Sequence, residues 1–190
     1  PPTEFNQKIL VPFPIESALS GIMDTNFEEN ARSTFVYQRT FKLPKAYKGR
    51  HILLHFGAVD WKCAVYVNGQ KAGSHSGGND PFSMDITKLL RDGEEQEIQV
   101  TVTDPTTHGG QPLGKQTLKP GGCFYTPVTG IWQTVWIEPV SPAHISRYDV
   151  TSDIDAGTVS LTITSDCTSA TADIIVKDGQ KTVAKLTGMS

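Results

Sequence analysis

Basic residues are not in excess in this sequence, and long apolar runs are missing from it. Of its 190 residues, 17 are Lys or Arg and 20 are Asp or Glu, which gives a net charge of −3. Nucleic-acid binding draws its affinity from basic side chains that neutralise phosphates, so we expect no nucleic-acid partner. No apolar run approaches the roughly 18 residues of a membrane-spanning helix, so we expect no membrane partner either.

Cysteine is also scarce, and Cys63, Cys123 and Cys167 lie far apart. Their odd number and wide spacing match neither a disulfide framework nor a zinc motif, so we interpret them as small buried or half-buried thiols. The five histidines show no metal-ligand spacing, and no glycine pair opens a helix with a phosphate-binding motif. The sequence therefore predicts no metal site and no cofactor.

Helix signals are few, and the dominant hydrophobic period is two, which is typical of strands with one buried face. The Asn68-Gly69 pair accepts the positive φ angles of a type I′ hairpin turn between two such strands. Many short strands separated by turns that contain Gly or Pro predict an all-β sandwich. In the first three quarters of the chain, the expected strands cover residues 34–43, 50–56, 62–67, 70–75, 98–103 and 131–137.

The expected strand over residues 131–137 carries Trp132 and Trp136, which fall on one face of it. Tryptophans in such a position are more often anchors in a core or at a domain interface. The alternative is that they form a platform for a sugar, because indole rings stack on apolar C–H surfaces.

A domain boundary is expected between Pro139 and Pro142, since these prolines interrupt sheet pairing and stiffen the link. We therefore predict one domain over residues 1–140 and a second over residues 143–190. An immunoglobulin-like sandwich needs roughly 100 residues and about seven strands, so the second domain is expected to be incomplete and the protein to continue beyond Ser190. Such a half-sandwich would expose its apolar face or pair with a second copy, which allows a homo-oligomer.

Four stretches carry motifs that are weak one by one but specific in this order and spacing. They are residues 9–22 (ILVPFPIESALSGI), residues 56–87 with the hairpin Val65-Tyr-Val-Asn-Gly69, residues 111–116 (QPLGKQ) and residues 124–138 (FYTPVTGIWQTVWIE). Together they resemble the N-terminal sugar-binding domain of glycoside hydrolase family 2, the family of β-galactosidases and β-glucuronidases. The resemblance implies a jelly-roll, galactose-binding-like β-sandwich, followed by a partial immunoglobulin-like domain.

The resemblance also implies that binding and catalysis are carried by different domains of the parent protein. In this family both catalytic glutamates sit on a C-terminal (β/α)₈ barrel, which these residues do not include, so we assign no catalytic residue here. We expect a non-catalytic fragment that supports the missing barrel and lends a loop to its cleft for a terminal β-glycoside. A stand-alone carbohydrate-binding module is the alternative, and an adhesin built of repeats ranks last because the two halves show no internal repeat.

The chain starts with proline rather than methionine, so we expect the true N-terminus to lie upstream. A periplasmic or secreted location is favoured over a cytoplasmic one.

A long segment rich in Gly and Pro, residues 104–122, leads to Phe124 and Tyr125. Long loops on a small domain are often functional, and aromatic faces stack on sugars, so we predict that both rings contact a saccharide. The alternative is that both rings pack within the domain. The family has an aspartate six residues before Gly130, where this sequence has Phe124, so stacking or shaping replaces that polar contact.

A second candidate contact with a saccharide is the turn over residues 76–81. Asn79 and Asp80 offer polar groups suited to sugar hydroxyls. The alternative is that both are ordinary turn formers.

Overall fold

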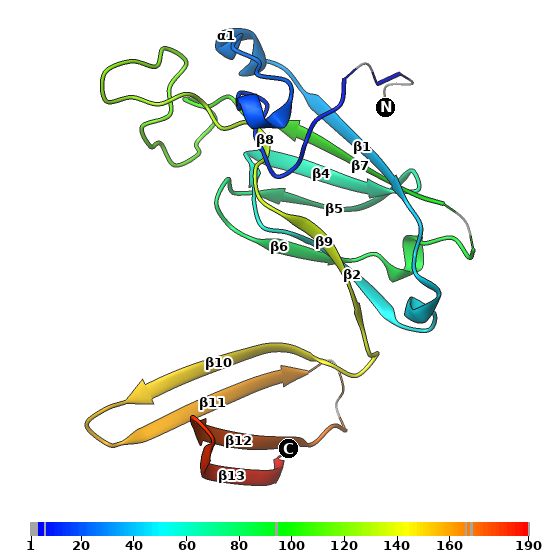
Figure 1. Cartoon of the computed structure of the whole chain (residues 1–190), viewed down its shortest axis with the longest axis vertical. Coiled ribbons are helices and arrows are strands. Elements are labelled where there is room, and N and C mark those ends of the chain that lie inside the picture. Colours follow the sequence, from blue (N-terminus) through cyan, green and yellow to red (C-terminus); the bar gives the residue numbers. More distant parts are fainter. Residues whose placement is uncertain (1–3, 6, 94, 166, 168, 190) are drawn as a thin grey trace. The chain divides into compact units, whose positions relative to one another are not determined.

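The structure is a computed structural model, and each of its two compact units, Pro1–Pro139 and Val140–Ser190, is described by itself (Figure 1). It describes residues 4–5, 7–93, 95–165, 167 and 169–189. Both units are built from strands, and the helical elements are single turns. They are η1 (Ala18–Ser20), α1 (Phe27–Asn30), η2 (Lys45–Tyr47) and η3 (Thr87–Leu89). The predicted all-β fold class is confirmed. Within the described part of the chain, no helix has the length and apolar character needed to cross a membrane.

The first unit is a β-sandwich of two main sheets and one short strand pair (Figure 1). The larger sheet has the order β1 (Phe35–Phe41), β7 (Gln96–Thr103), β4 (Lys62–Val67), β5 (Gln70–Ser76). The smaller sheet has the order β6 (Phe82–Asp85), β2 (His51–Phe56), β9 (Val135–Val140). The short pair joins β3 (Val59–Asp60) and β8 (Gly130–Ile131).

The core lies between the apolar faces of these sheets. Burial alternates strictly along β2 and β4, as a period of two requires. The buried members of one hydrophobic cluster come from both sheets and from the segments between them: Ile52, Leu54, Phe56, Val59, Cys63, Val65, Val67, Ile86, Val100, Val102 and Ile131. The core therefore fixes which face of each strand points outward, and so which side chains are free to bind.

The strand predicted over residues 131–137 is interrupted, and this prediction was wrong in detail. Gly130–Ile131 pairs with β3, and β9 begins only at Val135, in the smaller sheet. The break coincides with a change of pairing partner, because β8 pairs with β3 whereas β9 pairs with β2. Trp132 consequently lies in the break and Trp136 on β9, so they do not share one strand face.

The second unit consists of two hairpins in separate two-stranded sheets (Figure 1). Their strands are β10 (Ile145–Asp153), β11 (Thr158–Ser165), β12 (Ala172–Asp178) and β13 (Lys181–Met189). None of the described residues of this unit is buried, and the opposed pair Val150 and Leu161 exposes its apolar side chains. The assignment of residues 143–190 to an incomplete immunoglobulin-like domain stays a prediction.

A buried amide network ties the β4–β5 turn to the rest of the first unit. Asn68 and Gly69 both have positive φ, at 51° and 79°, as the predicted type I′ turn requires. The Asn68 amide donates to the Gln96 side-chain carbonyl at 2.7 Å and to the Leu89 carbonyl at 2.8 Å. Gln96, which is buried, also accepts from the Arg91 backbone N–H at 2.9 Å and donates to the Arg91 carbonyl at 2.8 Å.

Gln96→Ala should lower the free energy of unfolding by about 1–3 kcal/mol, because it removes a buried side chain that forms several partly buried hydrogen bonds with Asn68 and Arg91. Urea denaturation of the purified chain measures this change. The matched control is Gln70→Ala at an exposed position next to the same turn, which should change stability by less than about 0.5 kcal/mol. Equal effects of the two substitutions would contradict the role of the network.

Candidate functional site

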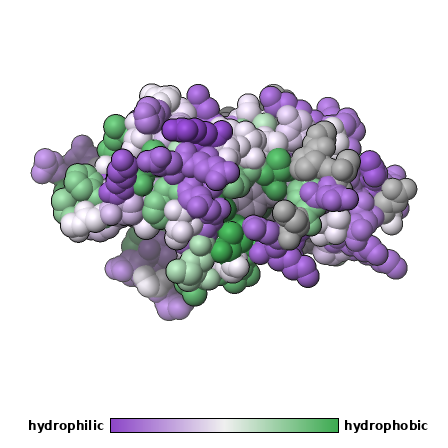
Figure 2. Space-filling view, turned by 90° about the horizontal axis from the view of Figure 1, so that it is seen from above, coloured by the Kyte–Doolittle hydropathy of each residue, from purple (hydrophilic) through white to green (hydrophobic). Residues whose placement is uncertain are grey.

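The long loop between β7 and β8, residues 104–129, projects from the same end of the sandwich as α1 (Figure 1). Lys119 Nζ in this loop lies 3.8 Å from Glu28 Oε1 of α1, with both side chains mostly exposed. Figure 2 views the molecule from above and shows hydrophobic side chains exposed among hydrophilic ones. Phe124 and Tyr125, two of the predicted saccharide-binding residues, belong to this loop.

The base of the β7–β8 loop is held by one carboxylate. Asp104 follows β7 directly and is only 2% exposed. Its Oδ1 accepts from the Thr106 backbone N–H at 2.7 Å and from Gln111 Nε2 at 3.0 Å, while its Oδ2 accepts from Thr129 Oγ1 at 3.1 Å. Thr106 and Gln111 lie in the first part of the loop and Thr129 at its end. Asp104 therefore ties both ends of the loop together.

A second acidic side chain reaches the same point from the N-terminal segment. Glu16 Oε2 accepts from the Thr129 backbone N–H at 3.0 Å. Next to Thr129, Gly130 has φ +97°, and a Cβ there would overlap the Tyr37 hydroxyl. Glycine alone combines this positive φ with the absence of a Cβ. Hydrogen bonds to Thr129 and close packing at Gly130 therefore fix the end of the loop.

The end of β3 and the break between β8 and β9 anchor the second predicted loop. A Cβ at Gly78 would lie 2.6 Å from the Asp60 carboxylate, and Trp132 Nε1 donates to the Gly78 carbonyl at 2.8 Å. In the β7–β8 loop, a Cβ at Gly109 would lie 2.8 Å from the Trp61 ring. Asp60 and Trp61 thus contact both loops that carry predicted site residues.

Glu16, Asp60 and Asp104 form an acidic cluster, and burial dominates the electrostatics of Glu16 and Asp60. It raises the pKa of Asp60 to about 7, and the nearby charges of Asp104 and Glu16 add to the increase. Burial likewise raises the pKa of Glu16 and, at the neighbouring hydroxyl, that of Tyr37. Among the described residues no group of three His, Cys, Asp or Glu side chains is arranged to hold a metal ion.

Phe124 and Tyr125 lie near the far end of the loop and are 52% and 57% exposed. Their backbone is ordered by hydrogen bonds: Phe124 exchanges two with Gly121, and Tyr125 N–H donates to the Lys115 carbonyl at 2.9 Å. The Lys115 ammonium lies 5.7 Å from the centre of the Tyr125 ring. The rings are therefore presented to solvent, and their contact with a saccharide stays a prediction.

Asn79 and Asp80 are both exposed on the β5–β6 turn. The Asp80 carboxylate folds back over Gly77, where a Cβ would lie 2.8 Å from its Oδ2. Within the described residues no hydrogen bond or ring contact joins this turn to Phe124 or Tyr125. The structure brings together the anchors of the two loops rather than their tips, and sugar binding by Asn79 and Asp80 stays a prediction.

Sequence reasoning missed Glu16, Asp60 and Asp104, the side chains that position both loops. The available signal was a carboxylate embedded in an apolar stretch, as in Val59-Asp60-Trp61. Carboxylates buried in such surroundings need several hydrogen-bond donors, which points to a structural or functional role.

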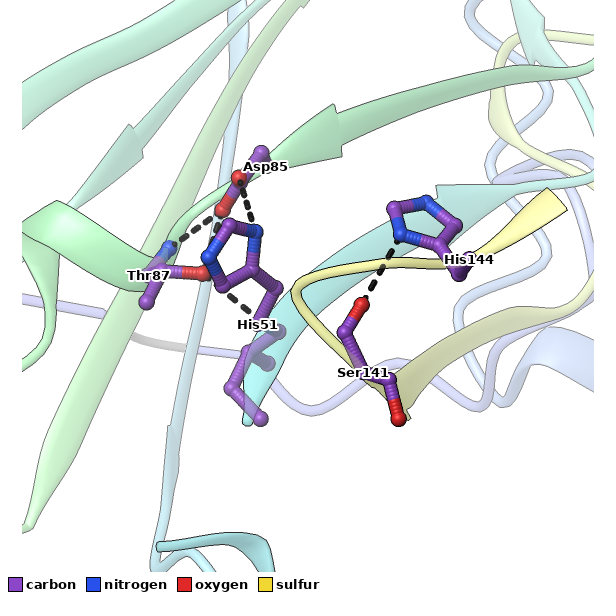
Figure 3. Close-up of polar contacts among 6 residues, drawn as sticks. His51, Asp85, Thr87, Ser141 and His144 are labelled. Carbon is purple, nitrogen blue, oxygen red and sulfur yellow. Dashed lines mark hydrogen bonds and ion pairs between the residues drawn. The ribbon is translucent and has the colours of Figure 1, made fainter. Parts of the chain in front are cut away.

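Histidine contacts lie elsewhere on the molecule (Figure 3). His51 Nδ1, at the start of β2, lies 3.5 Å from Asp85 Oδ2, and Asp85 Oδ1 accepts from the Thr87 backbone N–H at 2.8 Å. In the second unit, His144 Nδ1 lies 2.9 Å from the Ser141 carbonyl oxygen. Asp85 thus closes the turn that precedes η3.

Comparisons with known proteins agree with this architecture. Residues 2–118 match the family described as "Glycosyl hydrolases family 2, sugar binding domain". The chain belongs to this family, and the resemblance stated from its motifs is confirmed.

The chain covers a small part of its relatives. A β-galactosidase of Thermoanaerobacter pseudethanolicus is 30% identical over 138 residues, which are 72% of this chain and 18% of that protein. A β-glucuronidase of Paenibacillus borealis is 29% identical over 111 residues, 58% of this chain and 17% of that protein. The chain therefore spans about a fifth of the length of these relatives.

Solved structures share the fold at low identity. A β-glucuronidase from an uncultured Clostridium sp. superposes with a TM-score of 0.71 at 21% identity, over 94% of this chain and 31% of that one. The β-D-glucuronidase of Dictyoglomus thermophilum gives a TM-score of 0.62 at 24% identity, over 82% of this chain and 29% of that one. These likenesses support the β-sandwich fold.

Asp60→Asn should flatten the pH dependence of stability. With a pKa near 7 in the folded chain against an ordinary value near 3.8, Asp60 keeps its proton on folding, so its contribution to stability is lost as pH rises from about 4 to 7. The variant should gain stability relative to the natural chain over this range, by at most about 1.4 kcal/mol per pH unit. Urea denaturation at several pH values measures it.

The control is Asp80→Asn, at an exposed carboxylate on the neighbouring turn, whose curve should run parallel to that of the natural chain. A parallel curve for Asp60→Asn as well would show that Asp60 does not retain its proton.

Proposed function

We propose that this chain is the non-catalytic N-terminal part of a family 2 glycosidase, supporting a catalytic barrel and presenting the β7–β8 loop to the saccharide. The relatives support this proposal, because they are β-galactosidases and β-glucuronidases of which the chain covers about a fifth. The observation that carries it is the loop itself. Phe124 and Tyr125 are exposed at its far end, while Asp104 clamps its base.

The buried carboxylates do not suit catalysis. A retaining glycosidase uses two carboxylates about 5–5.5 Å apart, one as acid and base and one as nucleophile facing the sugar. Both Asp104 oxygens accept hydrogen bonds from the loop. The unbonded oxygens, Oε1 of Glu16 and Oδ1 of Asp60, are shielded from solvent. These groups hold the loops, and cleavage by double displacement belongs to the barrel.

The loop contributes through contact rather than proton transfer. An aromatic face covers the apolar C–H surface of a pyranose, and a tyrosine hydroxyl donates to or accepts from a sugar hydroxyl. Because the base of the loop is fixed, the rings lose little conformational freedom on binding, which favours affinity.

Phe124→Ala in the full-length enzyme should raise KM for aryl β-glycosides about 2–10-fold, with a smaller change in kcat, because one stacking contact contributes about 0.5–1.5 kcal/mol. Steady-state kinetics measure this split. Tyr148→Ala, which removes an exposed ring from β10 in the second unit, should leave both constants unchanged. Unchanged kinetics for Phe124→Ala across several glycosides would remove the proposed role.

The isolated 190-residue chain should not hydrolyse aryl β-galactosides or aryl β-glucuronides, because the catalytic carboxylates are assigned to the barrel. Release of the chromogenic aglycone by the pure chain measures this directly, and turnover above a heat-denatured control would contradict the proposal. Calorimetry against a glycan panel distinguishes the alternative. Micromolar binding by the chain alone would indicate a stand-alone carbohydrate-binding module.

A further inference from the structure

The outward face of the smaller sheet carries an exposed tryptophan that is held by a histidine. His55 on β2 lies opposite Ser83 on β6 in the strand register, and its Nδ1 lies 2.6 Å from Ser83 Oγ. Its Nε2 lies 3.1 Å from Glu138 Oε2 on β9. The Ser83 hydroxyl and the Glu138 carboxylate therefore lie next to the two ring nitrogens and restrict the orientation of the imidazole.

Trp136 stacks on this imidazole, with ring centroids 4.8 Å apart and an interplanar angle of 13°. The stack covers one side of the histidine, whose side chain is only 13% exposed. Trp136 nevertheless remains 46% exposed. The indole is thus oriented in advance, and much of its surface still faces water.

The other tryptophans of the chain are used differently. Trp61 is 8% exposed and packs at the base of the loops, and Trp132 donates its indole N–H to the Gly78 carbonyl. A tryptophan that served only stability would bury its ring as Trp61 does, because the stabilising free energy is proportional to the apolar area removed from water. Folding of this unit therefore leaves the Trp136 indole available to a ligand.

The chemistry beside the ring narrows the class of ligand. Glu138 has a 53% exposed side chain, so its carboxylate can accept hydrogen bonds from hydroxyl groups next to a stacked ring. A flat apolar surface flanked by an acceptor matches a pyranose, which has a C–H face and hydroxyl donors at its edge. A carboxylate on the ligand would instead meet the Glu138 charge, which disfavours a uronic acid.

We propose that Trp136, with Glu138 and His55, forms a binding site for neutral pyranosides on the outer face of β2 and β9. The site contains no residue of the β7–β8 loop. A test of this site is therefore independent of a test of the role proposed for Phe124. Its ligand is a neutral sugar, and the two kinds of relatives, β-galactosidases and β-glucuronidases, suggest a galactoside and a glucuronic acid as the matched pair of probes.

NMR titration of the ¹⁵N-labelled chain with methyl β-D-galactopyranoside tests this site. The Trp136 indole signal and the amide signals of β2 and β9 should shift saturably, with a Kd in the millimolar range that is typical of a single stacked sugar. D-glucuronic acid at the same pH should bind at least about fivefold more weakly. Glu138→Gln should reduce this discrimination.

Two substitutions separate the site from the loop and from loss of folding. Trp136→Ala should abolish the shifts while the dispersed amide spectrum shows that the chain is folded, and Trp136→Phe should restore part of the binding. Phe124→Ala should leave the shifts unchanged. Three results would each overturn the proposal: no saturable shift, shifts that persist in Trp136→Ala, or equal binding of the uronic acid. Concentration-dependent self-association lost in Trp136→Ala, without sugar binding, would identify the face as a protein interface instead.

Discussion

The arrangement of the loops depends on one buried carboxylate. Asp104 receives hydrogen bonds from residues at both ends of the β7–β8 loop, so a long excursion of the chain begins and ends at a defined point of the sandwich. A buried carboxylate that lost these donors would carry a large desolvation penalty. The same hydrogen bonds that compensate the burial of this side chain therefore fix the position of the loop.

Much of the sandwich could be predicted because its information is local. Alternation along β2 and β4 and the positive φ angles of the Asn68-Gly69 turn depend on neighbouring residues alone. The break between β8 and β9 could not be predicted, since β8 pairs with β3 and β9 pairs with β2, and both partner strands are distant in the sequence. An unbroken period of two in residues 131–137 suggested one strand where the chain changes sheets.

The candidate site also has one part that the sequence could predict and one part that it could not. The exposure of Phe124 and Tyr125 agrees with a loop rich in Gly and Pro, which the composition indicated. The cluster of Glu16, Asp60 and Asp104 draws on three separate segments, and no spacing in the sequence relates them. The pKa values of Glu16 and Asp60 are raised by burial first and by neighbouring carboxylates second. Both causes arise only in the folded chain, so the sequence alone carries little sign of them.

The placement of two tryptophans gives the protein a built-in optical probe. The Trp61 ring lies against Gly109 of the β7–β8 loop, and the Trp132 indole is bonded to Gly78 of the β5–β6 turn. Indole emission responds to the polarity around the ring, so movement of either segment would change the intrinsic fluorescence of the chain. Ligand binding or unfolding that displaced either segment could thus be followed without attaching a dye.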